Sequence, residues 1–167
     1  MEKVILRAME PEDLDFLYMI ENDITLWDVS STNMYYSRYL LRDYVARCTG
    51  DIYTDKQLRL VAEDAVGEIV GIVDLVNFEP RHQRAEVGIV IRKNCRGKGY
   101  GQQALLQLTD YARRILHLHQ LYVYVDADNE TSMRLFEHAG FRRTTVLKDW
   151  LCLENNYRDV VFMQYFL

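Results

Sequence analysis

Arg96-Gly97-Lys98-Gly99-Tyr100-Gly101 is the stretch of this sequence that decides the fold. It follows an apolar run, Val87-Gly88-Ile89-Val90-Ile91, and precedes an amphipathic run that begins at Gln102. This order predicts a strand, a glycine-rich turn and a helix. Alternating glycines let a backbone approach a ligand closely, and a helix N-terminus behind them adds amide donors and partial positive charge. With Arg96 and Lys98 alongside, the stretch predicts a cradle for pyrophosphate and hence a phosphate-bearing cofactor.

The rest of the sequence predicts seven strands and four helices around this turn. Apolar alternation predicts strands at residues 3–7, 57–63, 68–78, 84–91, 121–125, 141–147 and 157–166. Helical spacing and capping residues predict helices at 10–22, 102–116 and 129–139, and a further helix capped within 30–33 and ended by 50–51. The helix at 102–116 is expected to bury one face made of Leu105, Leu108, Ala112 and Ile115. Hairpins with helices interleaved between the other strands predict a mixed α/β (α+β) fold with one central sheet.

Size and composition predict a single domain over residues 1–167. Of these 167 residues, 49% are hydrophobic and 27% are charged, a balance typical of globular proteins. No apolar run approaches the roughly 20 residues of a membrane span, and the N-terminus does not resemble a signal peptide. Three widely spaced cysteines argue against disulfides or a metal site and favour a cytoplasmic protein. A net charge of −5 disfavours nucleic acid as a partner and admits a cationic substrate.

The glycine turn also fits a second kind of cofactor. Gly99-Tyr100-Gly101-Gln102-Gln103-Ala104 matches the dinucleotide fingerprint G-x-G-x-x-A, and Asp126 follows the next predicted strand. That fingerprint normally follows the first strand of a parallel array, whereas here it lies in mid-chain after a hairpin. Because the fingerprint itself matches, a nicotinamide-dependent oxidoreductase stays open as an alternative.

A second motif connects the glycine turn to a known family. The run from Arg96 to Gly101 resembles the [QR]-x-x-G-x-[GA] motif of the GNAT (GCN5-related N-acetyltransferase) superfamily. The segment from Asn129 to Phe141, NETSMRLFEHAGF, resembles the second GNAT signature, N-x-x-[AS]-x-x-[LIV]-[YF]-x-x-x-G-F. Within the superfamily, Arg84-Ala85-Glu86-Val87-Gly88 and Tyr157-Arg158-Asp159 are similar to the branch that contains spermidine and ribosomal-protein N-acetyltransferases.

The resemblance implies a GNAT-like fold with acetyl-CoA as the cofactor. In that family one twisted, mostly antiparallel sheet with a splayed strand pair is flanked by about four helices. The strand before the glycine turn binds the pantetheine arm of CoA through its backbone, and the turn binds the pyrophosphate. On this chain the resemblance assigns cofactor binding to Ile89, Val90, Ile91, Arg96, Gly97, Lys98, Gly99, Tyr100, Gly101, Gln102, Asn129 and Phe136. Asn129 is also a suitable N-cap for the helix that follows it.

The implied reaction is direct attack of an amine on the acetyl thioester, which needs acid–base catalysis. An alkyl ammonium has a pKa of about 10 and must lose a proton, and the leaving thiolate benefits from a proton donor. Glu86 is the candidate general base, with a solvated carboxylate or an ion pair with Arg84 as its alternatives. Many GNAT enzymes have a tyrosine where this chain has Phe136, which cannot donate a proton. Either the thiolate leaves unassisted or through water, or a neighbouring hydroxyl group replaces the tyrosine. The candidate hydroxyl groups are Ser132 first and then Tyr122 and Tyr124.

Motifs and charge together predict an acetyl-CoA-dependent N-acetyltransferase that acts on a primary amine. The acceptor is either a small amine such as a polyamine or a protein N-terminus, and a homodimer is a further expectation from the family. A non-catalytic CoA-binding module is the alternative that Phe136 suggests. The acidic first helix and an aromatic set are candidates for lining the acceptor site. The alternative for the helix is a solvated face, and the alternative for the aromatic set is core packing or a dimer contact. The aromatic set is Trp27, Tyr35, Tyr36, Tyr39 and Tyr44.

Overall fold

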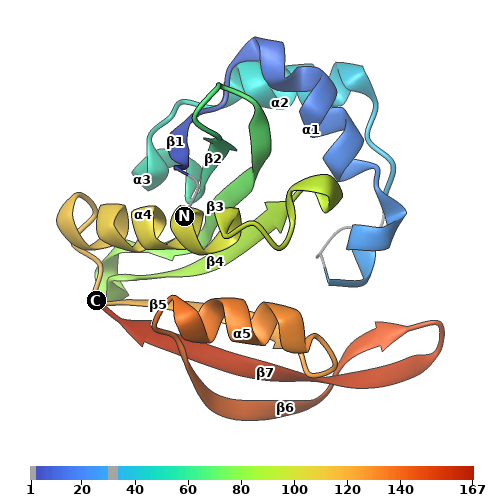
Figure 1. Ribbon diagram of the computed structural model, residues 1–167, viewed down its shortest axis with the longest axis vertical. Coiled ribbons are helices and arrows are strands. Elements are labelled where there is room, and N and C mark those ends of the chain that lie inside the picture. Colours follow the sequence, from blue (N-terminus) through green and yellow to red (C-terminus); the bar gives the residue numbers. More distant parts are fainter. Residues whose placement is uncertain (1–2, 30–33) are drawn as a thin grey trace.

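The computed structural model describes residues 3–29 and 34–167, and these residues form one seven-stranded sheet (Figure 1). The strands are β1 (Ile5–Ala8), β2 (Leu58–Glu63), β3 (Ile69–Glu79), β4 (Arg84–Ile91), β5 (Gln120–Asp126), β6 (Arg142–Leu153) and β7 (Asn156–Phe166). Their order across the sheet is β1-β2-β3-β4-β5-β7-β6, and every neighbouring pair is antiparallel except β4 and β5. The predicted mixed α/β fold with one mostly antiparallel sheet is confirmed.

The parallel strands β4 and β5 are joined at one end only. Residues 84–86 of β4 pair with residues 120–122 of β5, and no further pairing joins these two strands. Beyond this point β4 stays paired with β3 as far as Ile91, and β5 stays paired with β7 as far as Asp126. The two halves of the sheet therefore separate after Glu86 (Figure 1). The predicted splayed strand pair is confirmed.

Within the described residues, five helices cover the sheet: α1 (Leu14–Glu21), α2 (Arg38–Arg47), α3 (Ile52–Asp55), α4 (Tyr100–Arg114) and α5 (Glu130–His138). The predicted caps at 30–33 lie outside the described residues. Helix α2 begins directly after Ser37, whose hydroxyl accepts a hydrogen bond from the Leu40 amide at 3.1 Å. The single turn α3 is missing from the prediction, because four residues are too few to establish a helical period.

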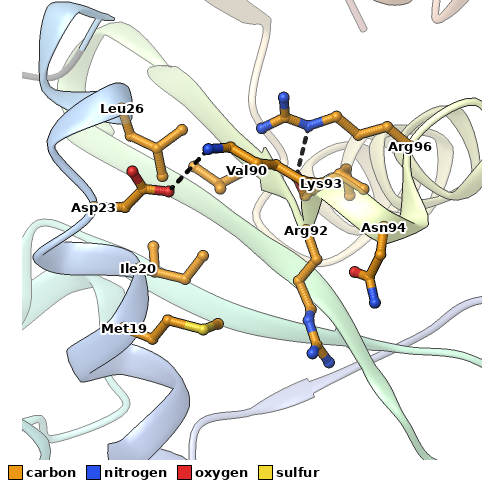
Figure 2. Close-up of a pocket in the computed structure, with 10 residues that line it drawn as sticks. Met19, Ile20, Asp23, Leu26, Val90, Arg92, Lys93, Asn94 and Arg96 are labelled. Carbon is orange, nitrogen blue, oxygen red and sulfur yellow. Dashed lines mark hydrogen bonds and ion pairs between the residues drawn. The ribbon is translucent and has the colours of Figure 1, made fainter.

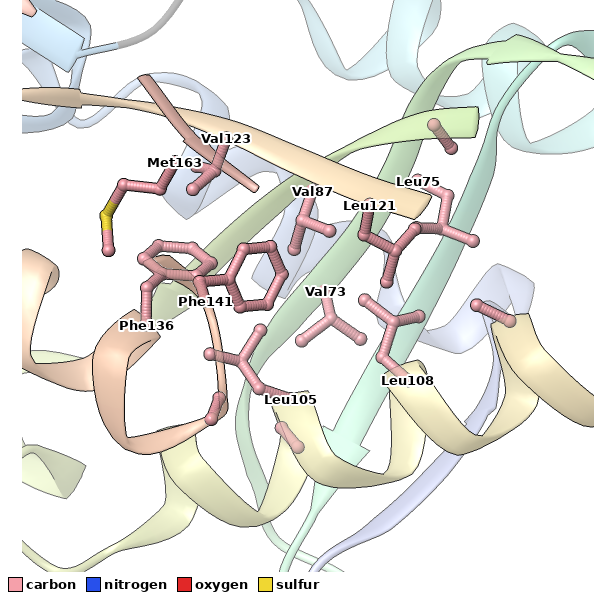
Figure 3. Close-up of a cluster of buried hydrophobic side chains, with 14 of the residues drawn as sticks. Val73, Leu75, Val87, Leu105, Leu108, Leu121, Val123, Phe136, Phe141 and Met163 are labelled. Carbon is pink, nitrogen blue, oxygen red and sulfur yellow. The ribbon is translucent and has the colours of Figure 1, made fainter. Parts of the chain in front are cut away.

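Alternating residues of the central strands supply two hydrophobic cores, one on each face of the sheet. Val73 and Leu75 of β3 belong to the larger core, where they meet Leu105 and Leu108 of α4 (Figure 3). Ile72, which precedes Val73 in the strand, belongs instead to the smaller core formed with α1 and α2. Because successive strand residues point to opposite faces, α4 and α5 cover one face and α1 and α2 cover the other.

The predicted boundaries of α4 are wrong by two residues at each end. The helix begins at Tyr100, so the last two residues of the glycine motif are already helical. It ends at Arg114, which leaves Ile115 past the helix and 61% exposed, contrary to its predicted burial. Leu116 is buried in its place.

No helix among the described residues is both long and apolar enough to cross a membrane.

Strand β6 is much longer than predicted. The expected strand ends at residue 147, whereas β6 continues to Leu153. Its pairing with β7 shifts between Leu147 and Leu151, so the alternation of apolar residues is interrupted there. The extension brings Trp150 over the central strands, where it stacks on Tyr124 of β5.

Candidate functional site

The glycine turn connects β4 to α4 at the open end of the splayed pair. Gly97 has a φ of 77° and Gly99 a φ of 86°, a left-handed backbone that residues with side chains rarely adopt. A Cβ added at Gly97 would meet no atom within 4 Å, so the backbone conformation and not crowding requires glycine there. Successive amides in such a turn form a concave surface that suits an anion.

The first turn of α4 continues this surface with backbone donors. Gly99 is the N-cap, and its carbonyl oxygen accepts the first helical hydrogen bond from the Gln103 amide at 3.1 Å. The amides of Gly101 and Gln102 precede that bond, so they have no acceptor within the helix. The positive end of the helix dipole lies at the same place. These donors fit the pyrophosphate group expected at the turn.

The side-chain positions of Tyr100 and Gly101 face the protein interior. Tyr100 is only 6% exposed and belongs to the larger core, so its ring is remote from a surface ligand. A Cβ at Gly101 would lie 3.3 Å from both Cδ atoms of Leu135 and 3.5 Å from Ile91 Cγ1. Gly101 therefore lets α4 approach α5 and β4 closely. At both positions only the backbone is suited to contact a cofactor.

Cationic side chains surround the turn. Arg96 donates its Nε to the carbonyl oxygen of Ile91 at 3.0 Å (Figure 2). Lys98 is exposed. Lys93 lies 3.9 Å from Asp23, which belongs to the segment after α1 (Figure 2). These charges make the mouth of the turn favourable for phosphate groups.

The edge of β4 that faces the gap offers backbone hydrogen-bonding groups. The backbone amide of Arg92 donates a hydrogen bond to the carbonyl oxygen of Val70 in β3 at 2.9 Å. Backbone groups of successive residues point to opposite sides of a strand in an antiparallel ladder. The amide and carbonyl groups of Val90 therefore face β3, as the amide of Arg92 does, whereas those of Ile89 and Ile91 face the gap beside β5. An extended chain can add to such an edge as a further strand would. The geometry suits the pantetheine arm at Ile89 and Ile91. The backbone groups of Val90 face β3 instead, so the backbone contact that the resemblance implies for Val90 is wrong.

A pocket of about 240 Å³ lies between the end of α1 and the end of β4 (Figure 2). Its helical wall is mainly apolar and is formed by Met19, Ile20, Leu26 and the carboxylate of Asp23. Its other wall carries the cations and is formed by Val90, Ile91, Arg92, Lys93, Asn94 and Arg96. Three of the predicted cofactor-binding residues, Val90, Ile91 and Arg96, therefore meet at one cavity.

Glu86 lies on the last paired rung before β4 and β5 separate. It is half-buried and stands opposite Tyr122 of β5. Its Oε2 accepts a hydrogen bond from Asn77 Nδ2 at 2.8 Å. Among the described residues it forms no ion pair with Arg84, so that alternative for Glu86 is wrong. Burial raises the pKa of the Tyr122 hydroxyl, and the negative charge of Glu86 raises it further.

Two more carboxylates lie near Glu86 and share one arginine. Arg59 Nε is 2.8 Å from Asp74 Oδ1, and Arg59 Nη1 is 2.5 Å from Glu21 Oε1. Asp74 of β3 stands opposite Gly88, two residues beyond Glu86 on the same face of β4. One guanidinium faces two carboxylates, so the cluster keeps a net negative charge. With Glu86 it makes this face of β3 and β4 acidic.

An aromatic group borders the acidic face on the β5 side. This group consists of Tyr122, Tyr124, Trp150 and Phe162. Tyr124 stacks on Trp150 at 6.0 Å between ring centroids, and Tyr122 and Tyr124 lie 5.6 and 5.2 Å from Phe162. A hollow of about 290 Å³ on this face is lined by Arg84, Gln120, Tyr122, Tyr124, Phe162 and Gln164.

The sequence prediction missed Trp150 and Phe162 and placed the aromatic wall elsewhere. In the predicted wall, Tyr35 and Tyr39 are 73% and 75% exposed, whereas Tyr36 and Tyr44 pack against the smaller core. These side chains therefore do not share one surface. The spacing of Tyr122 and Tyr124 could have indicated the observed group, because residues two apart in a strand point to the same face.

The three predicted residues of α5 differ in their surroundings. Asn129 Oδ1 accepts a hydrogen bond from the Ser132 amide at 3.0 Å, which confirms its role as the helix cap. Its contact with the cofactor stays a prediction. Ser132 is half-buried in the first turn of the helix. Phe136 is 2% exposed and packs edge-on against Phe141 at 5.1 Å, an apolar position that suits a ring without a hydroxyl (Figure 3).

Comparison with known proteins gives consistent matches over most of the chain. The family model for the acetyltransferase (GNAT) domain matches residues 3–142. Spermidine N(1)-acetyltransferase of Vibrio cholerae is 28% identical over 95% of this chain and 90% of its own length. The Escherichia coli K12 enzyme of the same name is 29% identical over 96% of this chain and 84% of its own length.

Solved structures agree with these matches. The crystal structure of the Vibrio cholerae spermidine N-acetyltransferase in complex with CoA and spermine has a TM-score of 0.88 at 28% identity. The similarity covers 98% of this chain and 95% of that one. A dodecameric structure of the same Vibrio cholerae enzyme has a TM-score of 0.84.

Proposed function

The chain belongs to the GNAT acetyltransferase family and is an acetyl-CoA-dependent N-acetyltransferase, and we propose that its acceptor is a polyamine such as spermidine. The observation that carries the proposal is the acidic face of β3 and β4 beside the aromatic group, at the point where β4 and β5 separate. The comparisons give no support to a non-catalytic CoA-binding module or to a nicotinamide-dependent oxidoreductase.

Polyamines match this surface because they are flexible chains of methylene groups with ammonium groups between them. Glu86 and the Arg59-bridged pair of Glu21 and Asp74 attract ammonium groups. Aromatic faces such as those of Tyr124 and Trp150 bind ammonium groups and cover methylene groups. The polyamine acceptors named for the relatives support the same choice of substrate class.

The glycine turn and the free edge of β4 fit CoA. We assign the pyrophosphate to the amides that run from Gly97 to Gln102, with Arg96 and Lys98 as counter-charges. The backbone of Ile89 and Ile91 is assigned to the pantetheine arm. Acetyl-CoA supplies an activated thioester whose carbonyl carbon accepts the amine nitrogen.

Glu86 and a hydroxyl group divide the proton transfers between them. Glu86 holds the acceptor ammonium and takes one proton from it at a carboxylate oxygen, which frees the nitrogen lone pair that attacks the thioester carbon. The nitrogen releases its second proton to solvent after the carbon–nitrogen bond has formed. When the carbon–sulfur bond breaks, the thiolate takes a proton from a hydroxyl group. Tyr122 and Ser132 are the two donors in this proposal, since Phe136 has none. The raised pKa of Tyr122 keeps its hydroxyl protonated at neutral pH, as a proton donor must be.

The dodecamer described for the Vibrio cholerae enzyme supports an oligomeric assembly of this chain as well. The homodimer expected from the family resemblance is the simplest unit of such an assembly. Multi-angle light scattering of the purified chain measures its mass directly, and a mass of one chain would contradict oligomerisation.

The cytoplasmic location stays a prediction.

A panel of amines tests the acceptor. Release of CoA is followed with spermidine, spermine, putrescine, an amino sugar and a peptide with a free N-terminus. We expect kcat/KM for spermidine or spermine to exceed that for the peptide and the amino sugar by at least about a hundredfold, or about 2.7 kcal/mol of transition-state stabilisation. A preference for the peptide or the sugar would contradict the polyamine proposal and leave the enzyme class unchanged.

A further inference from the structure

Strand β3 contains an irregularity directly beside Glu86. Val76 pairs with Glu86 of β4, and Glu79 pairs with Arg84, so three steps along β3 match two steps along β4. One extra residue is therefore inserted into β3, which defines a β-bulge. Bulges of this kind redirect side chains and occur often beside active sites.

The bulge changes which face of the sheet Asn77 occupies. Leu75 and Phe78 both belong to the larger core, although residues three apart in a regular strand point to opposite faces. The extra residue between them is Asn77, whose φ of 49° is left-handed. Asparagine tolerates this conformation better than most residues that carry a side chain. As a result Asn77 turns away from the core and toward the face that carries Glu86.

The redirected amide contacts the carboxylate that faces the acceptor. Asn77 Nδ2 donates to Glu86 Oε2 at 2.8 Å, and no other hydrogen-bond donor to this carboxylate is found in the part of the chain that the structure describes. One oxygen of Glu86 is thus held by the protein, which leaves Oε1 for the acceptor. A carboxylate held at one oxygen has fewer orientations to lose when an amine binds.

We propose that Asn77 is a positioning residue that fixes the Glu86 carboxylate so that Oε1 faces the acceptor amine. The proposal rests on the proposed function, in which Glu86 takes up the proton of the amine. Asn77 acts through Glu86 and touches neither acetyl-CoA nor the amine. Its contribution therefore exists only while Glu86 is present.

The test uses a substitution that keeps the bulge. Asn77→Gly retains the left-handed backbone and removes the amide. Asn155→Gly is the matched control, because Asn155 has a φ of 64° in the exposed β6–β7 turn and lies at a different place in the fold. We expect Asn77→Gly to lower kcat about tenfold, a part of the roughly 10²–10⁴ that acid–base catalysis contributes. KM for acetyl-CoA should not change, and Asn155→Gly should keep the wild-type kcat.

A double-mutant cycle distinguishes positioning from a general structural effect. In the Glu86→Gln background, Asn77→Gly should change kcat by less than about twofold, because contacting residues that act as a unit are not additive. Multiplicative effects of the two substitutions would overturn the proposal, as would a wild-type kcat in folded Asn77→Gly. Asn77→Asp should lower kcat at least as much as Asn77→Gly, since it places a second carboxylate against Glu86. A wild-type kcat in Asn77→Asp would also overturn the proposal.

The same series separates this proposal from the proposed function. If Glu86→Gln is slow but Asn77→Gly is not, only the positioning role fails. If Glu86→Gln itself keeps the wild-type kcat, the base assignment fails and the positioning role fails with it. Thermal unfolding of each variant ensures that the rates compare folded proteins.

Discussion

The two sides of the gap between β4 and β5 are built from different parts of the polypeptide. On the cofactor side, the donors are backbone amides of one short segment, from Gly97 to Gln102, placed by left-handed glycines and a helix N-terminus. On the acceptor side, the functional groups are side chains from α1 and five strands, from Glu21 to Phe162. A backbone site depends on chain conformation, whereas a side-chain site depends on which residues the fold brings together. The two sides should therefore respond to different kinds of substitution.

The largest effect should follow from a change of backbone conformation at the turn. Gly99→Val places a branched side chain at a φ of 86°, so the turn must rearrange and its amides must turn away from the phosphates. We expect the affinity for acetyl-CoA, measured by calorimetry, to fall at least about a hundredfold, or about 2.7 kcal/mol.

Gly67→Val is the matched control for this change. Gly67 has a φ of 85° in the hairpin turn between β2 and β3, with no atom within 4 Å of an added Cβ. The Gly67→Val variant should lose stability because of a similar backbone strain, but it should keep the wild-type affinity for acetyl-CoA. Wild-type affinity in a folded Gly99→Val variant would show that the turn is not the pyrophosphate site.

Gly101 should behave differently from Gly99 although both belong to the same motif. A side chain at Gly101 presses on Leu135 of α5 and on Ile91, so the effect falls first on packing. Overpacking of this kind costs about 1–3 kcal/mol, and Gly101→Val should lower the unfolding free energy by that amount in urea titrations. Leu135→Ala should restore part of the loss by making room. An undiminished unfolding free energy in Gly101→Val would contradict the packing role.

The proton donor should be revealed by comparing two hydroxyl deletions. Tyr122→Phe and Ser132→Ala each remove one candidate, and the true donor should cost about tenfold in kcat, at the lower edge of typical acid–base contributions. Burial raises the pKa of Tyr122 above the value of about 10 for a free tyrosine. If Tyr122 is the donor, the loss of rate caused by its ionisation lies above pH 10 and disappears in Tyr122→Phe. Wild-type rates in both variants would leave proton donation to solvent.

The smallest effect should come from the aromatic group, where each contact is weak. Trp150→Ala removes the ring that stacks on Tyr124, and cation–π contacts at exposed sites contribute about 0.5–1 kcal/mol. We expect KM for spermidine to rise about two- to fivefold while KM for acetyl-CoA is unchanged. Tyr39→Ala, at a tyrosine that is 75% exposed on α2, should change neither value. Equal changes in both KM values for Trp150→Ala would argue for a general loss of structure.

The contrast between the two sides also explains how much the sequence predicts. The glycine turn, the bounds of β4 and the Asn129 cap of α5 depend on residues that are close together in the chain, and the structure agrees with these predictions. Trp150 reaches the site because β6 extends through a register shift that no local pattern indicates. The same holds for Asn77, since a bulge depends on the partner strand as well as on its own sequence.

A crystal structure of the chain with CoA and spermidine would test the account most directly. We expect the pyrophosphate oxygens to accept hydrogen bonds from the amides between Gly97 and Gln102, at about 2.7–3.2 Å. An amine nitrogen of spermidine should lie within the same range of Glu86 Oε1, with its methylene chain against the aromatic group. A pyrophosphate bound away from the turn, or a spermidine bound without contact to Glu86, would contradict the division into a backbone cofactor site and a side-chain acceptor site.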